Sequence, residues 1–279
     1  MCAIEIGALR RNSRLVAWPA FFLQVLVAIS FEVGDDLGRG LFAQRGTLQG
    51  IENARQLVNF EVAHDLWDEP AWQMFFLQTR HVFALTITWL DMAHIMNAIY
   101  VLGHVFFTLG VACWVYFRRH RYFTLLRNII ILTNGLALIV YENFPVAPPR
   151  LTTDLWFNHH RFTFDDTVFG ILSNGGHLVG SQAGYNEFSA MPSVHFAWAL
   201  VAGLSLVFLA RPLAIRAIGV IYPPLMLLAV VVTGNHYFLD VAGGVVVVVV
   251  ATSCSLALAR WPGRERWPRP VRQLVLGQG

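Results

Sequence analysis

Long apolar runs separated by shorter polar segments dominate the hydropathy pattern of the chain. A helix needs roughly 20 apolar residues to cross the hydrocarbon core of a bilayer. Six runs come close to this length: 15–33, 93–117, 128–144, 193–210, 214–233 and 236–259. The third and fourth runs are short, so we expect their helices to extend into flanking residues. The pattern predicts an all-α fold, a polytopic membrane bundle with about six transmembrane helices.

The composition supports this class. Hydrophobic residues make up 56% of the chain and charged residues only 13%, and the mean hydropathy is +0.54. A soluble domain is typically about 45–50% apolar and about 25% charged. No internal repeat or low-complexity linker divides the sequence, so we interpret residues 1–279 as a single integral membrane domain.

The arginines indicate the orientation, because basic residues accumulate on the cytoplasmic side of membrane helices. Nearly all acidic residues fall on the opposite side, so we expect both termini to be cytoplasmic. The first apolar run resembles a signal peptide, but no small-residue cleavage site follows it, and we interpret it as an uncleaved helix. The predicted cytoplasmic arginines are Arg10, Arg11, Arg14, Arg118, Arg119, Arg121, Arg127, Arg211, Arg216, Arg260, Arg264, Arg266, Arg269 and Arg272.

The net charge of +3 does not indicate nucleic-acid binding, since the basic clusters lie just beyond helix ends where membrane insertion already explains them. Cys2, Cys113 and Cys254 lie near the predicted cytoplasmic side without metal-ligand spacing, so we expect neither a disulfide framework nor a metal site from them. All basic residues are arginine, which suggests a GC-rich bacterial genome and hence a bacterial plasma membrane.

Two extramembrane stretches fall on the predicted extracytoplasmic side. Residues 34–92 contain apolar positions at helical spacing, and Pro70 begins a second apolar and aromatic stretch, as in an interfacial helical segment. This segment either packs on the bundle as a lid or has a role in substrate specificity. The helically spaced positions are Ile51, Ala54, Val58, Val62 and Leu66.

The second stretch, 145–192, begins with a proline-rich sequence that should end the preceding helix. On the predicted topology it meets two short motifs at the extracytoplasmic face, although up to about 90 residues separate them. One motif is Pro192-Ser193-Val194-His195. The other places Asp240 four residues after His236, where a carboxylate can orient an imidazole. Two histidines in this setting indicate phosphoryl chemistry at a bilayer surface.

These motifs resemble the signatures of the type 2 phosphatidic acid phosphatase superfamily, K-x6-R-P, P-S-G-H and S-R-x5-H-x3-D, over roughly residues 128–250. Pro192 to His195 fit the second signature, with Val194 in place of glycine. His236 and Asp240 fit the third, and Arg150 fits the first. The departures are Asn143 at the lysine position, Leu151 at the proline position and Ala229 at the arginine position.

Within this superfamily the chain looks most like the inositol phosphorylceramide synthase (aureobasidin-resistance) branch and its bacterial relatives. The matching features are the sequences Ala147-Pro148-Pro149-Arg150 and His236-Tyr237 with Asp240. Phe164-Asp165-Asp166-Thr167 and the set Asn97, Tyr100 and His104 are also similar to bacterial members. The resemblance implies a catalytic core at 128–259 and chemistry without a metal or other cofactor.

Chemistry and resemblance assign the same roles to the site residues. An unprotonated imidazole of His236 attacks phosphorus, while Asp240 holds the proton on its other ring nitrogen. His195 acts as general acid and base, which is typically worth about 10²–10⁴-fold. Arg150 suits bidentate contact with phosphate oxygens, and Ser193 with backbone N–H groups forms an anion site.

Each assignment has a structural alternative. Arg150 would otherwise be an interface anchor and Ser193 a helix cap. For Asp91, His94, Asn97 and His104 we favour a structural role over a functional one. A metal site built from His159, His160, His177 and nearby acids has no diagnostic spacing. We expect headgroup contacts from His159, His160, Arg161 and Asn143.

Three functional hypotheses follow. The first is a lipid phosphotransferase or phosphatase that forms a phosphohistidine on a phospholipid or polyprenyl phosphate headgroup, with a lipid alcohol or water as acceptor. The branch resemblance favours an inositolphosphotransferase-like reaction over hydrolysis of phosphatidate or polyprenyl pyrophosphate. The second is a transporter, against which the sequence lacks inverted repeats and paired broken helices. The third is a noncatalytic scaffold, against which both histidines are retained.

Overall fold

The computed structural model describes residues 47–82, 85–152, 156–157, 160–161, 164–168 and 188–261. Helices make up most of this part of the chain, and two short antiparallel hairpins join them. The elements are α2 (Thr47–Ala63), α3 (Glu69–Phe76), β1 (Arg80–Val82), β2 (Leu85–Ile87), α4 (Trp89–Ala98), η2 (Ile99–Phe107), α5 (Thr108–Arg118), η3 (His120–Tyr122), α6 (Phe123–Asn143), η4 (Pro149–Leu151), β3 (Trp156–Phe157), β4 (His160–Arg161), α8 (Val194–Leu209), α9 (Leu213–Val232) and α10 (Phe238–Arg260).

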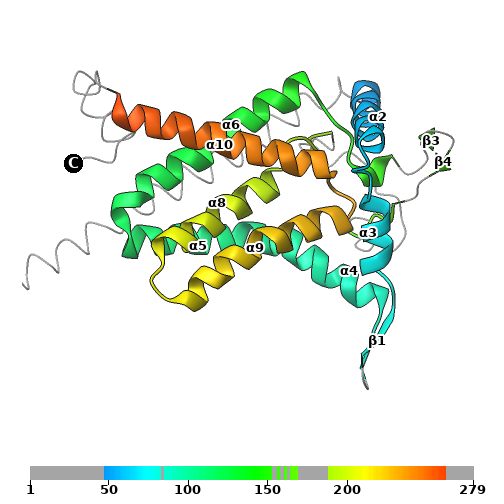
Figure 1. Cartoon of the computed structure of the whole chain (residues 1–279), viewed down its shortest axis with the longest axis horizontal. Helices are drawn as coiled ribbons and strands as arrows, with labels where there is room; N and C mark the ends of the chain where they lie inside the picture. The colour runs from blue at the N-terminus through cyan, green and yellow to red at the C-terminus, as the bar shows by residue number, and fades with distance from the viewer. Residues whose placement is uncertain are drawn as a thin grey trace, which may run out of the picture.

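The long helices run lengthwise side by side as a bundle (Figure 1). Helices α8 and α9 pack closely against each other, and two glycines permit this. A methyl group on Gly203 would lie 2.5 Å from the carbonyl oxygen of Gly219, and one on Gly219 would lie 2.6 Å from that of Gly203. Small residues at such crossings let helix backbones approach without steric conflict, as is common in membrane bundles.

Four helices in the described part of the chain are long and apolar enough to cross a membrane: Trp89–Arg118, His120–Asn143, Leu213–Val232 and Phe238–Arg260. Val194–Leu209 is a shorter apolar helix. The all-α prediction is confirmed. The predicted run 15–33 lies outside the described residues, so a total of about six spans stays a prediction.

The observed helix boundaries agree with the prediction for the third run and differ from it in the fourth run and in the second span. The third run extends as expected, because α6 begins at Phe123. The fourth run does not extend. Pro192 precedes the Ser193 N-cap of α8, and Pro212 follows the end of α8 at Leu209, so α8 keeps only 16 residues. The second span contains the π-helical segment η2, which the sequence pattern did not indicate.

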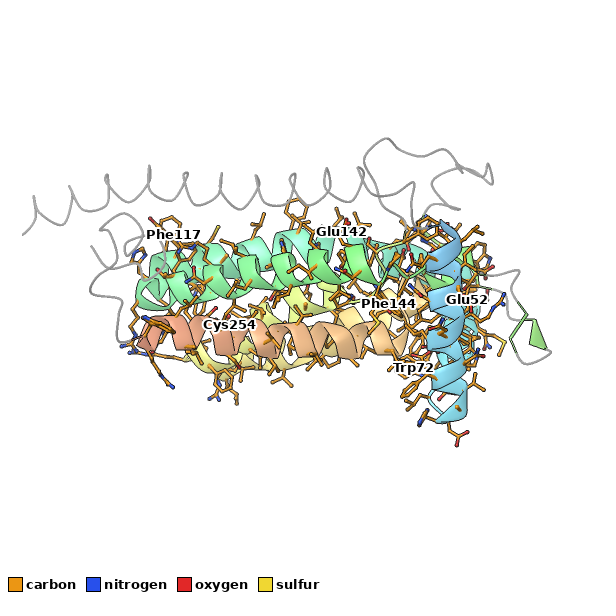
Figure 2. The ribbon with its side chains drawn as sticks, turned by 90° about the horizontal axis from the view of Figure 1, so that it is seen from above. Glu52, Trp72, Phe117, Glu142, Phe144 and Cys254 are labelled. Atoms are coloured by element: carbon orange, nitrogen blue, oxygen red, sulfur yellow. The ribbon has the colours of Figure 1, made fainter. Side chains whose placement is uncertain are left out.

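Helices α2 and α3 lie across the end of the bundle where α10 begins (Figures 1 and 2). Ala54 and Val58 of α2 are buried, as the helical spacing predicted, whereas Leu66 is exposed beyond the end of that helix. The β1–β2 hairpin follows α3 and was not predicted. Residues 34–46 of the predicted interfacial segment lie outside the described residues.

Candidate active site

Three segments that are distant in sequence meet at the end of the bundle that α2 and α3 cover. The backbone N–H of Arg150 donates to the carbonyl of Gly234 at 2.9 Å. The backbone N–H of Ser193 donates to the carbonyl of Asp240, also at 2.9 Å. These bonds bring η4 and the starts of α8 and α10 together, as the predicted topology required.

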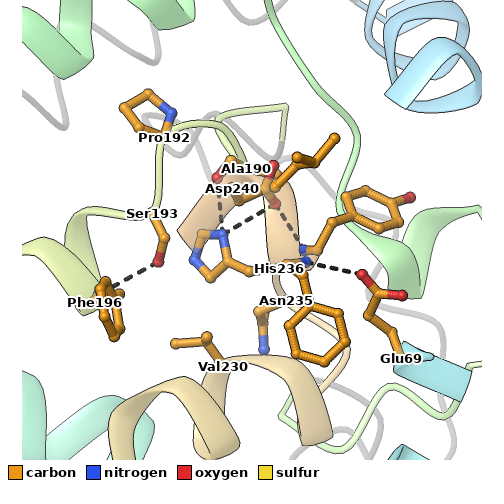
Figure 3. Close-up of polar contacts among 12 residues, drawn as sticks. Glu69, Ala190, Pro192, Ser193, Phe196, Val230, Asn235, His236 and Asp240 are labelled. Atoms are coloured by element: carbon orange, nitrogen blue, oxygen red, sulfur yellow. Dashed lines mark hydrogen bonds and ion pairs between the residues drawn. The ribbon is translucent and has the colours of Figure 1, made fainter. Parts of the chain in front are cut away.

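His236 is buried just before α10, and a backbone carbonyl fixes its ring (Figure 3). Its Nδ1 lies 2.8 Å from the carbonyl oxygen of Ala190. Because a carbonyl only accepts hydrogen bonds, we assign the ring proton to Nδ1, which leaves a lone pair on Nε2. Asp240 Oδ2 lies 3.4 Å from Nδ1 and accepts the backbone N–H of Tyr237 at 2.8 Å. The nearer partner of the His236 ring is therefore the Ala190 carbonyl, and Asp240 is the farther one.

His195 lies in the first turn of α8 and faces His236, with ring centroids 5.8 Å apart. Two other rings enclose it, and both come from η2. Tyr100 stacks on His195 with centroids 4.1 Å apart, and His104 lies at 4.3 Å. π-Helical segments are rare and occur frequently at functional sites. This one forms a wall that fixes the position of the His195 ring.

Arg150 is buried next to the segment that carries His236, and two side chains hold its guanidinium. Its Nε donates to Asn235 Oδ1 at 3.0 Å, and its Nη1 lies 3.8 Å from Asp166 Oδ2. A guanidinium offers five N–H donors in a planar fork that matches phosphate oxygens. With only 6% of the residue exposed, its environment does not fit an anchor at the membrane surface.

Ser193 is fully buried and is the N-cap of α8. Its Oγ accepts the backbone N–H of Phe196 at 3.3 Å, so the capping alternative is correct for this oxygen (Figure 3). The hydroxyl still has a hydrogen to donate. The helix N-terminus beside it carries partial positive charge, which favours an anion there.

Together these features form a site with an unprotonated imidazole nitrogen, a second imidazole and a buried guanidinium at one helix-bundle end. The sequence model of a protein family, the PAP2 superfamily, matches residues 65–254, more than half of the chain. The chain belongs to the PAP2 superfamily. Comparisons with curated proteins and with solved structures found no match.

Membership in the PAP2 superfamily confirms the broad resemblance seen in the signatures and supports a phosphatase or phosphotransferase of the lipid phosphatase kind. With its long apolar helices, this PAP2 chain is an integral membrane protein. Its place in the inositol phosphorylceramide synthase-like branch stays a prediction.

The headgroup residues expected in this PAP2 chain are placed only in part. His159 lies outside the described residues, and His160 and Arg161 are described only as the backbone of β4. Asn143 is exposed, and its Nδ2 donates to the carbonyl of Ile139 in its own helix at 2.7 Å. Its amide is thus engaged one turn back along α6, and a headgroup role for it stays a prediction.

A short strap, residues 164–168, connects three parts of the PAP2 site and was not foreseen. Gln73 of α3 exchanges two hydrogen bonds with the backbone of Asp165, at 2.8 and 3.0 Å. Asn97 of α4 exchanges two with Thr167, at 2.6 and 2.9 Å. Between Asp165 and Thr167, Asp166 faces Arg150. Asn97 thus lies beside the site, and His104 lies next to His195. Both are residues for which the sequence favoured a structural role.

Among the residues that the structure describes, no group of three or more His, Cys, Asp or Glu side chains is arranged to hold a metal ion. His159 and His177, two of the ligands considered from the sequence, lie outside those residues. Metal-independent chemistry stays a prediction.

Proposed function

We propose that this protein is a lipid phosphotransferase that passes the phospho-headgroup of a membrane lipid to an alcohol through a phosphohistidine on His236. The observation that carries the proposal is the His236 ring. Its Nδ1 faces the Ala190 carbonyl, so Nε2 is the nucleophilic nitrogen, and a second imidazole and a buried guanidinium accompany it.

In the first half-reaction, the Nε2 lone pair of His236 attacks phosphorus, and the bond from phosphorus to the lipid alcohol oxygen breaks. The leaving alkoxide takes a proton from the His195 imidazolium. Positive charge on the phosphorylated His236 ring is stabilised by the Ala190 carbonyl and by the Asp240 carboxylate, 3.4 Å from Nδ1.

In the second half-reaction, neutral His195 takes the proton of the acceptor hydroxyl, and the acceptor oxygen attacks phosphorus. The phosphorus–nitrogen bond breaks and frees Nε2 of His236. A lipid alcohol as acceptor gives headgroup transfer, and water gives hydrolysis, so both reactions use the same groups. Family membership supports both, and the branch resemblance favours transfer of a group such as inositol phosphate.

The site end of the bundle is expected to face the extracytoplasmic side of a bacterial plasma membrane, with both termini cytoplasmic. The asymmetric arginine distribution supports this orientation. Residues 128–259 form the catalytic core in this proposal, and residues 34–92 form an interfacial segment. Exposed apolar side chains on α2 and α3, Leu48, Phe60, Met74 and Phe75, suit contact with the membrane interface.

Substrate turnover tests the proposal. The purified protein would receive phosphatidate, polyprenyl pyrophosphate, or phosphatidylinositol with diacylglycerol or ceramide. Free phosphate and new phospholipids are then measured by colorimetry and mass spectrometry. We expect a headgroup-exchanged lipid that is lost in His236→Ala. Free phosphate alone would make the protein a phosphatase, and silence in both assays would contradict the proposed chemistry.

Replacing Arg150 by lysine is expected to lower kcat/KM by about 10²–10³-fold, because lysine keeps the charge but loses the planar fork that matches developing phosphate charge. Steady-state kinetics on the active substrate measures the loss. Arg55→Lys is the matched control, since Arg55 is exposed on α2 and pairs with Glu52 of the same helix. An Arg150→Lys variant within threefold of the wild type would contradict phosphate binding by this residue.

Two substitutions of Ser193 separate capping from phosphate contact. Ser193→Ala should destabilise the protein by about 0.5–2 kcal/mol, whereas glycine at an N-cap costs only about a few tenths of a kcal/mol. We expect both variants to lose about tenfold in kcat/KM, because both lack the hydroxyl donor. Thermal unfolding and kinetics are measured in parallel. Full activity in Ser193→Gly would leave Ser193 as a cap alone.

A further inference from the structure

Three carboxylates cap the first turn of α10, directly after the proposed nucleophile. Asp240 Oδ2 accepts the backbone N–H of Tyr237 at 2.8 Å, and Glu69 Oε1 accepts that of Phe238 at 2.8 Å (Figure 3). Glu61 Oε1 accepts the backbone N–H of Leu239 at 2.9 Å. The first N–H groups of a helix have no partner within the helix, and its N-terminus favours negative charge. This cap thus ties α2 and α3 to the start of α10.

The two glutamates lie close together, because they accept the N–H groups of two successive residues. All three carboxylate residues are fully buried, with no exposed surface. Glu69 and Glu61 accept the adjacent backbone N–H groups of Phe238 and Leu239, while Oε2 of each has no hydrogen-bond partner among the described residues. Two ionised carboxylates cannot bond to each other, because each only accepts. A single proton on the pair removes the repulsion between the two carboxylates and gives one of them a hydrogen to donate.

Electrostatics places that proton on Glu61. Burial raises the pKa of Glu61 to about 10, and the neighbouring Glu69 carboxylate acts in the same direction. Burial also raises the pKa of Glu69, but its bond from the Phe238 N–H acts against this shift. Because the pKa of Glu69 is raised to about 7 and that of Glu61 to about 10, the pair carries one proton between about pH 7 and pH 10.

Within the described residues, three further titratable groups lie near the pair, and all belong to the segment 236–240. Asp240 adds a third carboxylate from α10. Tyr237 is buried beside the pair, and burial holds the pKa of its hydroxyl well above the usual range, so it stays neutral. Its hydroxyl lies 3.0 Å from Thr152 Oγ1. His236 precedes Tyr237 and lies 3.4 Å from Asp240.

We propose that Glu61 and Glu69 form a one-proton carboxyl pair that positions His236 and Asp240 for catalysis. The proposal rests on the proposed function of His236. The pair fixes the register of the first turn of α10 through the N–H groups of Phe238 and Leu239, and that turn carries Asp240 and directly follows His236. Glu61 lies before residue 65, so the family match does not include it.

Loss of the shared proton leaves three buried carboxylates at the start of α10. Their mutual repulsion loosens the cap and displaces the His236 ring from its aligned position. A displacement of about 1 Å costs on the order of 10²-fold in rate. Because a raised carboxyl pKa means that the folded protein binds the proton more tightly, this contribution to stability and alignment decreases as pH rises toward about 10.

Glutamine at position 61 tests the pair, because its amide mimics a carboxyl group that keeps its proton. The Nε2 of Glu61→Gln is expected to donate to the Glu69 carboxylate, and its Oε1 still accepts the Leu239 N–H. We expect its kcat at pH 7 to stay within about threefold of the wild type and its alkaline decline to be weaker. Glu61→Ala should lose about 10–100-fold in kcat with little change in KM.

The assay measures kcat and KM from pH 7 to 10.5 with the lipid substrate that gives His236-dependent turnover, and thermal unfolding at each pH. Glu52→Gln is the matched control, since Glu52 lies on the same helix with its side chain 56% exposed, and we expect it to follow the wild type. A Glu61→Gln variant as impaired as Glu61→Ala, or one with the wild-type alkaline decline, would overturn the proposal.

The unfolding measurement separates this inference from the proposed function. If no substrate gives His236-dependent turnover, the proposed function fails. The shared proton is still tested, because the wild type should lose more thermal stability than Glu61→Gln as pH rises toward about 10. Equal losses in the two proteins would refute the one-proton pair itself.

Discussion

Replacement of His236 by asparagine is expected to lower turnover by about 10³–10⁶-fold, the range found when a nucleophile is removed from an otherwise intact site. Asparagine retains an N–H that can donate to the Ala190 carbonyl, which now accepts from Nδ1 at 2.8 Å. It has no nitrogen lone pair that can attack phosphorus. The loss should therefore appear in kcat while the protein stays folded.

The measurement is steady-state kinetics together with thermal unfolding in the same detergent. His94→Ala is the matched control, because His94 is an exposed histidine on α4. It should retain wild-type activity. If His236→Asn kept more than a tenth of the wild-type kcat, His236 would not be the nucleophile, and another group would have to carry the phosphoryl intermediate.

Replacement of His195 by alanine is expected to slow both half-reactions with a lipid substrate. With a leaving group that needs no proton, we expect it to slow only the second half-reaction. With a lipid alcohol as leaving group, both steps need proton transfer, and we expect a loss of about 10²–10⁴-fold. With a nitrophenyl ester of the same headgroup, the leaving phenolate needs no proton. Formation of the phosphohistidine should then remain fast, while its transfer to the acceptor stays slow.

The His195→Ala variant should therefore show a burst of nitrophenol, about one equivalent per active site, followed by slow turnover. Stopped-flow absorbance measures this burst. The His236→Asn variant provides the baseline, since it should release no burst with the same ester. Equal losses for lipid and nitrophenyl substrates, without a burst, would argue against His195 as the proton donor to the leaving group.

Hydropathy predicted most of the described fold because burial in lipid requires long apolar helices. The predicted run 93–117 falls within the observed helix Trp89–Arg118. The predicted run 236–259 falls within Phe238–Arg260 apart from its first two residues. Hydropathy could not predict where α8 begins and ends, because its ends depend on the Ser193 cap and on the flanking Pro192 and Pro212. Nor could it locate η2, because a π-helix leaves the hydropathy of a segment unchanged.

The meeting of the three site segments was predictable because helices of alternating direction bring alternate ends to the same face. The partners of the site residues were not. The contact of His236 with Ala190 uses a backbone carbonyl, which every residue has. Tyr100 and His104 lie one helical turn apart, a visible pattern, but only packing shows that both face His195.

Glu61 and Glu69 show the same limit most clearly. On amphipathic helices outside the apolar runs, acidic residues are typical of solvated faces. They are buried because the first N–H groups of α10 have no acceptor within their own helix. Glu61 of α2 and Glu69 of α3 accept these N–H groups across more than 160 residues of sequence. Such a requirement is a property of the folded arrangement and has no local sequence signal.

The central claim is the covalent phosphohistidine, and mass spectrometry of the trapped enzyme tests it most directly. The protein is mixed with substrate, quenched in alkali, where phosphohistidine is stable, and digested. We predict an acid-labile adduct on the His236 peptide. Its mass will correspond to phosphate plus headgroup for a transferase and to phosphate alone for a phosphatase. Turnover without any adduct on His236, including under burst conditions in His195→Ala, would contradict the account.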